Sequence, residues 1–250
     1  MPCLWVLITV SLCFLAFQNT SLPSPKAYLS VVEPIAYHLF LNVTLSEYTF
    51  TGKVSITLNL LNQTNLLQIP YTGESVGHVE FGPVNGQKLI PDSVHHHSGK
   101  LQISFQETLE PTQNPYMLSL LFSGSISTTD TFGFYASHYA LENGTTQTMA
   151  ISHFEPDGAR SVFPCFDEPA LKAIFDIAVE VEQPYSVISN TPLRERLGDT
   201  RKKFIFDQTP RMSTYLLAWS ISTLESISAK NTSGRLLRVF HPPNRAPDAR

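Results

Sequence analysis

The sequence predicts an all-β protein of antiparallel sheets, packed as a saddle or a sandwich, with little helix. Three observations predict this fold class. Hydrophobic and polar residues alternate in several short stretches, 18 prolines and 12 glycines interrupt the 250-residue chain, and no long stretch has helical periodicity. A hydrophobic content of 42% is enough for one sizeable core.

Four stretches alternate most clearly and are expected to be strands with one face on the core and one face in water. They are residues 37–44, 54–60, 101–106 and 175–182. In the first, Phe40 interrupts the polar face, which also carries Asn42. Further strands are expected at residues 116–122, 146–154, 203–206, 214–221 and 236–240, and a short helical turn at residues 170–173, after Pro169.

The N-terminus carries an uncharged apolar run, residues 4–17. A membrane-spanning helix needs about 20 such residues, whereas this length is typical of a secretory signal. We therefore expect a signal peptide over residues 1–21, with a short signal anchor or a buried core segment as alternatives. Residues 22–29 are rich in serine and proline and are expected to be a linker.

Sequons of the form Asn-x-Ser/Thr occur behind this leader, at Asn42, Asn62, Asn143 and Asn231, and a fifth lies at Asn19. Several sequons together with a leader predict a glycoprotein of the secretory pathway, located outside the cell or at its surface. We expect glycans at the four sequons that follow the linker.

Charge and cysteine content argue against a nucleic-acid-binding protein and against a fold held by disulfides. The net charge is −4 and there is no basic stripe, which argues against a nucleic-acid partner. Cys165 is the one cysteine outside the leader, so the processed chain can form no internal disulfide, and we expect a buried, inert thiol. His95, His96 and His97 are expected on an exposed loop, where adjacent histidines do not converge on one metal ion.

The most unusual stretch, residues 152–176, combines four phenylalanines with charged residues and three prolines. Its pieces Phe154-Glu155-Pro156, Ala159-Arg160 and Phe163-Pro164-Cys165-Phe166-Asp167-Glu168-Pro169 resemble the FEP…AR…FPCFDEP signature of aminopeptidase-N-like zinc enzymes, peptidase family M1. Residues 133–137 resemble the family's GFY-x-S segment, and residues 209–218 resemble its TPxMSTYLLA segment. The resemblance covers residues 30–250, which we take as one N-terminal β domain.

This resemblance implies a substrate site. In the family, the N-terminal domain packs over a thermolysin-like catalytic domain and contributes a Gln and a Glu to the pocket that binds the substrate's α-amino group. Glu155 matches the Glu, and His153 stands where the family usually has Gln. Without the family, Glu155 would be a surface carboxylate and His153 a ring packed beside Phe154.

Arg160, Asp167 and Glu168 are expected to support the loop that presents Glu155, since an arginine paired with a carboxylate would brace it. We expect no catalytic residue and no metal ligand in this chain. The zinc motif H-E-x-x-H is missing, because none of the eight histidines is followed by Glu. The family's Gly-Ala-Met-Glu-Asn motif is missing as well.

Zinc is therefore expected only in a catalytic domain beyond these residues, and the chain alone is expected to be inactive. The expected partners are peptide N-termini and the catalytic domain or a homologue. Association with a membrane stays open. Three hypotheses remain: the N-terminal part of a zinc aminopeptidase, an inactive secreted binding or regulatory module, and an adhesion sandwich, which the signature disfavours. For an isolated chain we expect an exposed apolar patch near residues 154–166.

Overall fold

The computed structural model describes residues 31–141 and 143–243, which form sixteen strands and three short 3₁₀ helices. The expected signal peptide, linker and Asn19 lie outside the described residues. Within those residues no helix is long and apolar enough to span a membrane. The chain is all-β, and its strands form four sheets.

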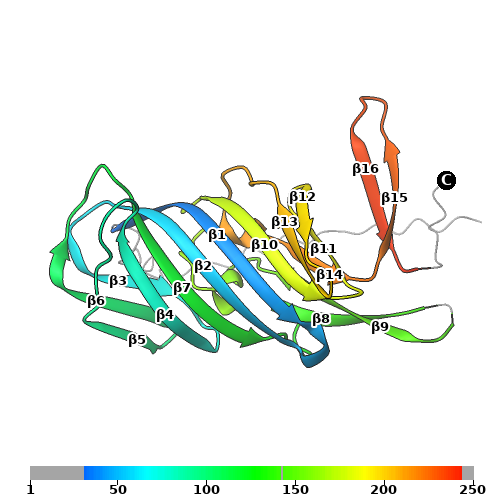
Figure 1. Ribbon diagram of the computed structural model, residues 1–250, viewed down its shortest axis with the longest axis horizontal. Coiled ribbons are helices and arrows are strands. Elements are labelled where there is room, and N and C mark those ends of the chain that lie inside the picture. The colour runs from blue at the N-terminus through cyan, green and yellow to red at the C-terminus, as the bar shows by residue number, and fades with distance from the viewer. Residues whose placement is uncertain (1–30, 142, 244–250) are drawn as a thin grey trace, which may run out of the picture.

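A seven-stranded sheet is the largest of them (Figure 1). Its order is β12 (Leu193–Leu197), β13 (Arg201–Phe206), β10 (Ile174–Glu182), β1 (Val32–Thr44), β2 (Thr49–Leu60), β7 (Tyr116–Ser125) and β4 (Ser75–Pro83). The alternation in β1 and β10 divides core from surface as predicted: Tyr37, Leu39 and Leu41 are fully buried, whereas His38 is exposed and Asn42 half-buried.

One pair in this sheet is parallel, which departs from the expected antiparallel pattern. β1 and β10 run in the same direction, from Ala36 opposite Ile174 to Val43 opposite Val181. Parallel strands need a crossover connection. The chain that joins β1 to β10 also contributes β2, β4 and β7 to this sheet, all of the three-stranded sheet, and β8 and β9 of the four-stranded sheet.

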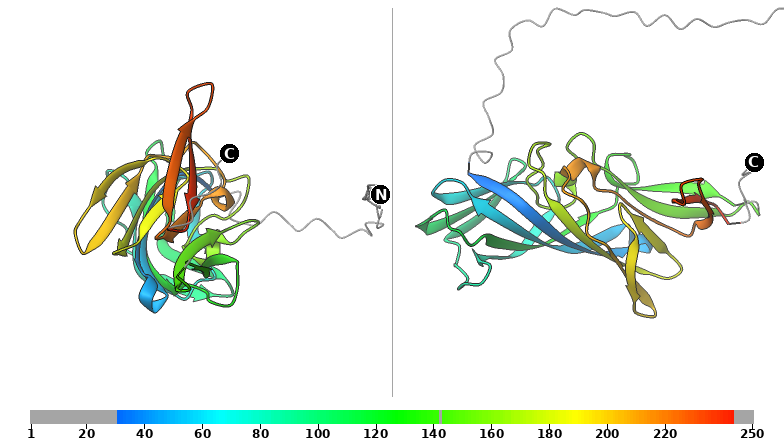
Figure 2. Two further views of the ribbon diagram at one scale, coloured as in Figure 1. Left: turned by 90° about the vertical axis from the view of Figure 1, so that its right-hand side faces the viewer. Right: turned by 90° about the horizontal axis from the view of Figure 1, so that it is seen from above.

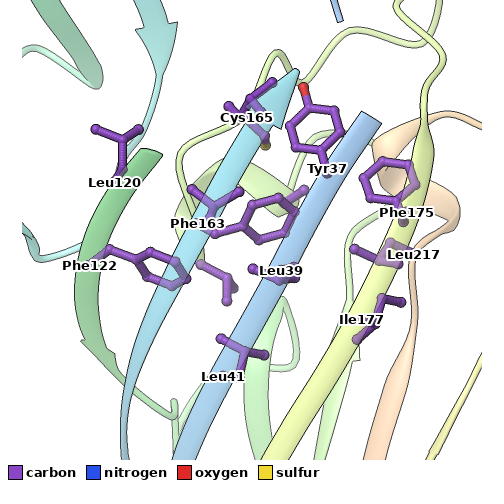
Figure 3. Close-up of a cluster of buried hydrophobic side chains, with 14 of the residues drawn as sticks. Tyr37, Leu39, Leu41, Leu120, Phe122, Phe163, Cys165, Phe175, Ile177 and Leu217 are labelled. Carbon is purple, nitrogen blue, oxygen red and sulfur yellow. The ribbon is translucent and has the colours of Figure 1, made fainter. Parts of the chain in front are cut away.

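A four-stranded sheet consists of β11 (Ser186–Ser189), β14 (Trp219–Ser222), β9 (Thr146–His153) and β8 (Gly133–Ala140), and a three-stranded sheet of β3 (Thr64–Pro70), β6 (Lys100–Leu109) and β5 (Ser93–His97). The inner face of the large sheet is covered by side chains from the loop after β9. Figure 3 shows Phe163 of this loop beside Leu39 of β1, and Cys165 beside Tyr37 of the same strand.

The last two strands, β15 (Glu225–Lys230) and β16 (Leu236–His241), form a hairpin of their own. The hairpin stands away from the other sheets (Figures 1 and 2). Nearly all of its residues are exposed.

Three local predictions were wrong. Residues 214–221 are not one strand: the 3₁₀ helix η4 (Thr214–Leu216) precedes β14. Residues 170–173 form no helix, because their only local bonds are turn contacts. His95, His96 and His97 lie in β5 rather than in a loop, where successive side chains point to opposite faces.

Candidate functional site

The signature loop, residues 154–169, leaves the end of β9 through a tight turn. The Phe154 carbonyl accepts a hydrogen bond from the Gly158 amide at 2.7 Å, and the Glu155–Pro156 peptide is cis. Glu155 lies exposed on this turn. Its carboxylate makes no hydrogen bond or ion pair with any residue in the described parts of the chain. The turn therefore presents one unpaired negative charge to solvent.

Aromatic packing fixes the start of the turn. The Phe154 ring is buried, with its centroid 5.1 Å from that of Trp219 on β14 and 6.2 Å from that of Phe163. Gly158 closes the turn where no side chain fits, because a Cβ there would lie 2.9 Å from the Phe132 ring and 3.0 Å from the His153 carbonyl oxygen. The backbone beside Glu155 is thus held on both sides.

His153, the last residue of β9, is exposed, but its ring is oriented. Nδ1 lies 3.0 Å from the Thr131 carbonyl oxygen, and the ring stands edge-on to Phe132 with a centroid separation of 6.3 Å. Because a carbonyl oxygen only accepts, Nδ1 carries the proton in this contact. The neutral ring then keeps Nε2 as an acceptor.

Arg160, in the 3₁₀ helix η3 (Ala159–Ser161), lies among three carboxylates. Its Nε is 3.2 Å from Asp167 Oδ2, and its Nη2 is 3.6 Å from Glu168 Oε1 and 3.8 Å from Asp157 Oδ2. The Arg160 amide also donates to Asp167 Oδ2 at 3.1 Å. These contacts join the two ends of the signature loop.

Asp167 is almost fully buried and also reaches the segment at residues 209–218, which the family resemblance singled out. The Thr214 hydroxyl donates to Asp167 Oδ1. Two further contacts hold the loop's exit: Ser213 Oγ donates to the Pro169 carbonyl at 2.7 Å, and Met212 exchanges backbone hydrogen bonds with Ala173. Residues far apart in the sequence thus close around one loop.

The loop's remaining aromatic residues are core. Phe154, Phe163 and Phe166 are at most 1% exposed, so the expected apolar patch near residues 154–166 does not exist. The Phe166 amide donates to the Tyr37 hydroxyl at 3.1 Å. Burial raises the pKa of Tyr37 and of the Cys165 thiol well above their ordinary values. Cys165 is therefore the buried, neutral thiol that the sequence predicted.

No group of three or more His, Cys, Asp or Glu side chains among the described residues could hold a metal ion. His96 instead packs on Tyr71 with ring centroids 5.0 Å apart, and its Nε2 lies 3.1 Å from the Tyr71 carbonyl oxygen.

Comparison with known proteins matches residues 33–216 to the peptidase M1 N-terminal domain. The chain belongs to this family. It is 34% identical over 236 residues to human endoplasmic reticulum aminopeptidase 1, 32% identical over 221 residues to puromycin-sensitive aminopeptidase of Caenorhabditis elegans, and 30% identical over 223 residues to the human thyrotropin-releasing hormone-degrading ectoenzyme.

These matches cover most of the chain but only part of each M1 relative. They include 91%, 85% and 85% of this chain, and 25%, 23% and 20% of the respective relatives. The chain thus spans about a quarter of their length. What the structure describes is an M1 N-terminal domain.

Sequence reasoning did not identify three residues on which the M1 signature loop depends: Thr214, which bonds Asp167, and Tyr37 and Trp219, which pack against the loop. Thr214 lies inside the recognised segment at residues 209–218, so the resemblance located it without its partner. The contacts of Tyr37 and Trp219 span 129 and 65 residues of sequence, and no local pattern reports them.

Proposed function

We propose that this chain is the amine-anchoring N-terminal domain of a zinc aminopeptidase that removes N-terminal residues from peptides. The observation that carries the proposal is the environment of Glu155. Its carboxylate is exposed and unpaired, and it lies on a turn that is held in place by the contacts of Phe154, Gly158 and Arg160. A flexible surface glutamate would need none of this support. The loop resembles the family signature that binds the substrate's free amine.

The chemistry of Glu155 fits an ammonium group. A carboxylate accepts charge-assisted hydrogen bonds from an ammonium, and these are stronger than neutral ones. A substrate that lacks a free α-amine would leave the carboxylate desolvated and unpaired, so the site would reject it. Arg160, Asp167 and Glu168 act as positioning residues, because they hold the loop and leave the Glu155 carboxylate free.

His153 is the second amine contact in this proposal. With Nδ1 donating to the Thr131 carbonyl, neutral His153 has an acceptor at Nε2 for one ammonium N–H. Protonation removes that acceptor and adds a like charge. The neutral ring is therefore the form that binds the substrate amine.

Zinc belongs to a catalytic domain that follows these residues in the whole enzyme. There it would polarise the scissile carbonyl and activate water. The leader and the sequons support a secretory or cell-surface location, as do relatives named as an endoplasmic reticulum enzyme and an ectoenzyme.

The test uses the full-length product that carries this domain and aminoacyl chromogenic substrates. Glu155→Gln is expected to lower kcat/KM by roughly 10- to 150-fold, because a hydrogen bond to a charged group contributes about 1.5–3 kcal/mol. Asp157→Asn is the matched control, since it removes a carboxylate from the same turn, and it should leave kcat/KM unchanged. Equal effects of the two variants would refute the role of Glu155.

A further inference from the structure

The outer face of the seven-stranded sheet has a shallow groove beside one of the sequons. The groove has a volume of about 540 Å³, within the range of ligand-binding pockets. The residues that line it include Phe40, Asn42, Thr51, Gly77, Leu121 and Ser123. They come from β1, β2, β4 and β7, and they combine small polar residues with two large apolar ones. Lys53 also lines the groove, on β2 opposite Phe40 and Leu121.

The sequon lies along one strand face. Phe40, Asn42 and Thr44 alternate on β1, so all three side chains point outward from the same face of the sheet. The Phe40 ring is half-buried, and the Lys203 ammonium lies 4.6 Å from its centroid. Lys203 lines a second hollow on the other side of Phe40. The ring thus has Lys203 on one side and the groove with Asn42 on the other.

Arg201 orients the Asn42 amide. Its Nη2 donates to Asn42 Oδ1 and also to the Val43 carbonyl at 2.6 Å, while Glu180 and Glu182 hold the rest of the guanidinium. An arginine only donates, so the amide oxygen faces β13 and Nδ2 faces away from it. The nitrogen that accepts a glycan is therefore turned toward the β2 side, where the groove lies.

We propose that an N-linked glycan on Asn42 lies in this groove, with its first N-acetylglucosamine stacked on Phe40 and contacting Leu121. A sugar ring presents C–H groups on one face and hydroxyls at its rim. The C–H face suits the aromatic ring, and the hydroxyls suit Thr51 and Ser123. Leu121 is 44% exposed without such a cover.

The other sequons differ from this arrangement. Asn62 and Asn143 are exposed, and Asn231 sits in the turn of the β15–β16 hairpin, where its Oδ1 accepts from the Ser233 and Arg235 amides. None of these three asparagines lines the groove. The inference rests on the proposed secretory location, and it implies that this sheet face is turned to solvent in the whole protein.

The test is native deglycosylation of the full chain, made in cells that keep N-glycans in the oligomannose form. An endoglycosidase that cleaves such glycans is added, and mass spectrometry follows each sequon with time. Asn42 should be released about tenfold more slowly than Asn143, as for a packed state favoured by about 1.4 kcal/mol. The two rates should be equal after denaturation.

Phe40→Ala should raise the Asn42 rate to that of Asn143, because the stacking partner is gone. Ile205→Ala is the control: Ile205 lines the hollow on the other side of Phe40, and its loss should leave the rate slow. A thermal melt of each variant reports whether it is folded; if Phe40→Ala does not fold, Phe40→Leu, which keeps an apolar side chain without a ring, takes its place.

Two results would overturn the inference alone: Asn42 unmodified while Asn62 or Asn143 is occupied, or Asn42 released as fast as Asn143. If no sequon is occupied, both the inference and the secretory location fail. The role proposed for Glu155 is tested separately by kinetics.

Discussion

Asp167 carries two independent sets of contacts at the centre of the M1 signature loop. Oδ2 accepts hydrogen bonds from the backbone amide and Nε of Arg160, and Oδ1 accepts one from the Thr214 hydroxyl. The side chain is only 2% exposed, so these donors take the place of water around its carboxylate oxygens. The residue thus ties the loop to the segment that precedes β14.

Asp167→Asn should destabilise the domain by about 3 kcal/mol, because removing one partner of a buried ion pair leaves the other uncompensated. Asp157→Asn should cost less than about 1 kcal/mol, since Asp157 is exposed and its contact with Arg160 is long. Urea unfolding of the two variants measures the difference. Equal midpoints would show that Asp167 does not hold the loop.

Cys165 should resist alkylation in the folded chain. Burial raises the pKa of this thiol well above its ordinary value, so at pH 8 it is neutral and shielded from reagent. Labelling with iodoacetamide, read at the Cys165 peptide by mass spectrometry, should be slow in buffer and complete in denaturant. Rapid labelling in buffer would contradict the packing described for the loop.

Some residues of the candidate site could be predicted from the sequence, and others could not. Glu155, Arg160, Asp167 and Glu168 could be selected because the signature is contiguous, and their anchoring and supporting roles stay predictions. The contact between Asp167 and Thr214 could not be predicted from pattern, because it joins residues 47 apart with four strands, β10 to β13, between them. The opposite error at Phe154 and Phe166 arose because clustered aromatics were taken for an interface when they fill the core.

Strands that alternate between core and solvent were predictable, whereas of the almost fully exposed strands only β16 was predicted, at residues 236–240. β1 and β10 alternate between core and solvent, so periodicity located them. β12 and β15 are exposed along their whole length, so neither has a face in the core, and neither was predicted. The parallel pairing of β1 with β10 was likewise beyond a reading of local patterns, because it depends on the path of the chain between them.

The β15–β16 hairpin carries the exposed apolar surface that was expected at the signature loop. Ile227 pairs with Val239 and Ala229 with Leu237, so four apolar side chains share one face. Leu237 and Val239 are 54% and 51% exposed. A two-stranded hairpin with such a face is at best marginally stable alone.

We therefore expect the purified domain to bind a hydrophobic dye and to self-associate through this face. Replacing Leu237 and Val239 by serine should lower dye fluorescence and shift the protein toward monomer in sedimentation. The same change at Leu193 and Leu197 of β12, which are also exposed, is the control and should have a smaller effect. Equal effects would show that the surface responsible for dye binding and self-association is not the hairpin face.

The whole chain carries the proposed amine anchor, Glu155, but no H-E-x-x-H motif. The purified 250-residue chain should hydrolyse no aminoacyl chromogenic substrate, even with added zinc, because the residues that bind the metal and act as base in this chemistry are missing from it. Chelator-sensitive activity from the chain alone would contradict the proposal that the zinc chemistry belongs to another domain.

We propose above that this domain works as part of a larger zinc aminopeptidase. The most direct measurement is the size and activity of the native product, captured from its source with an antibody against residues 31–243 and deglycosylated before blotting. We expect a single band well above 27.9 kDa, with chelator-sensitive aminopeptidase activity in the captured material. A band at or just below 27.9 kDa, with no activity, would contradict it.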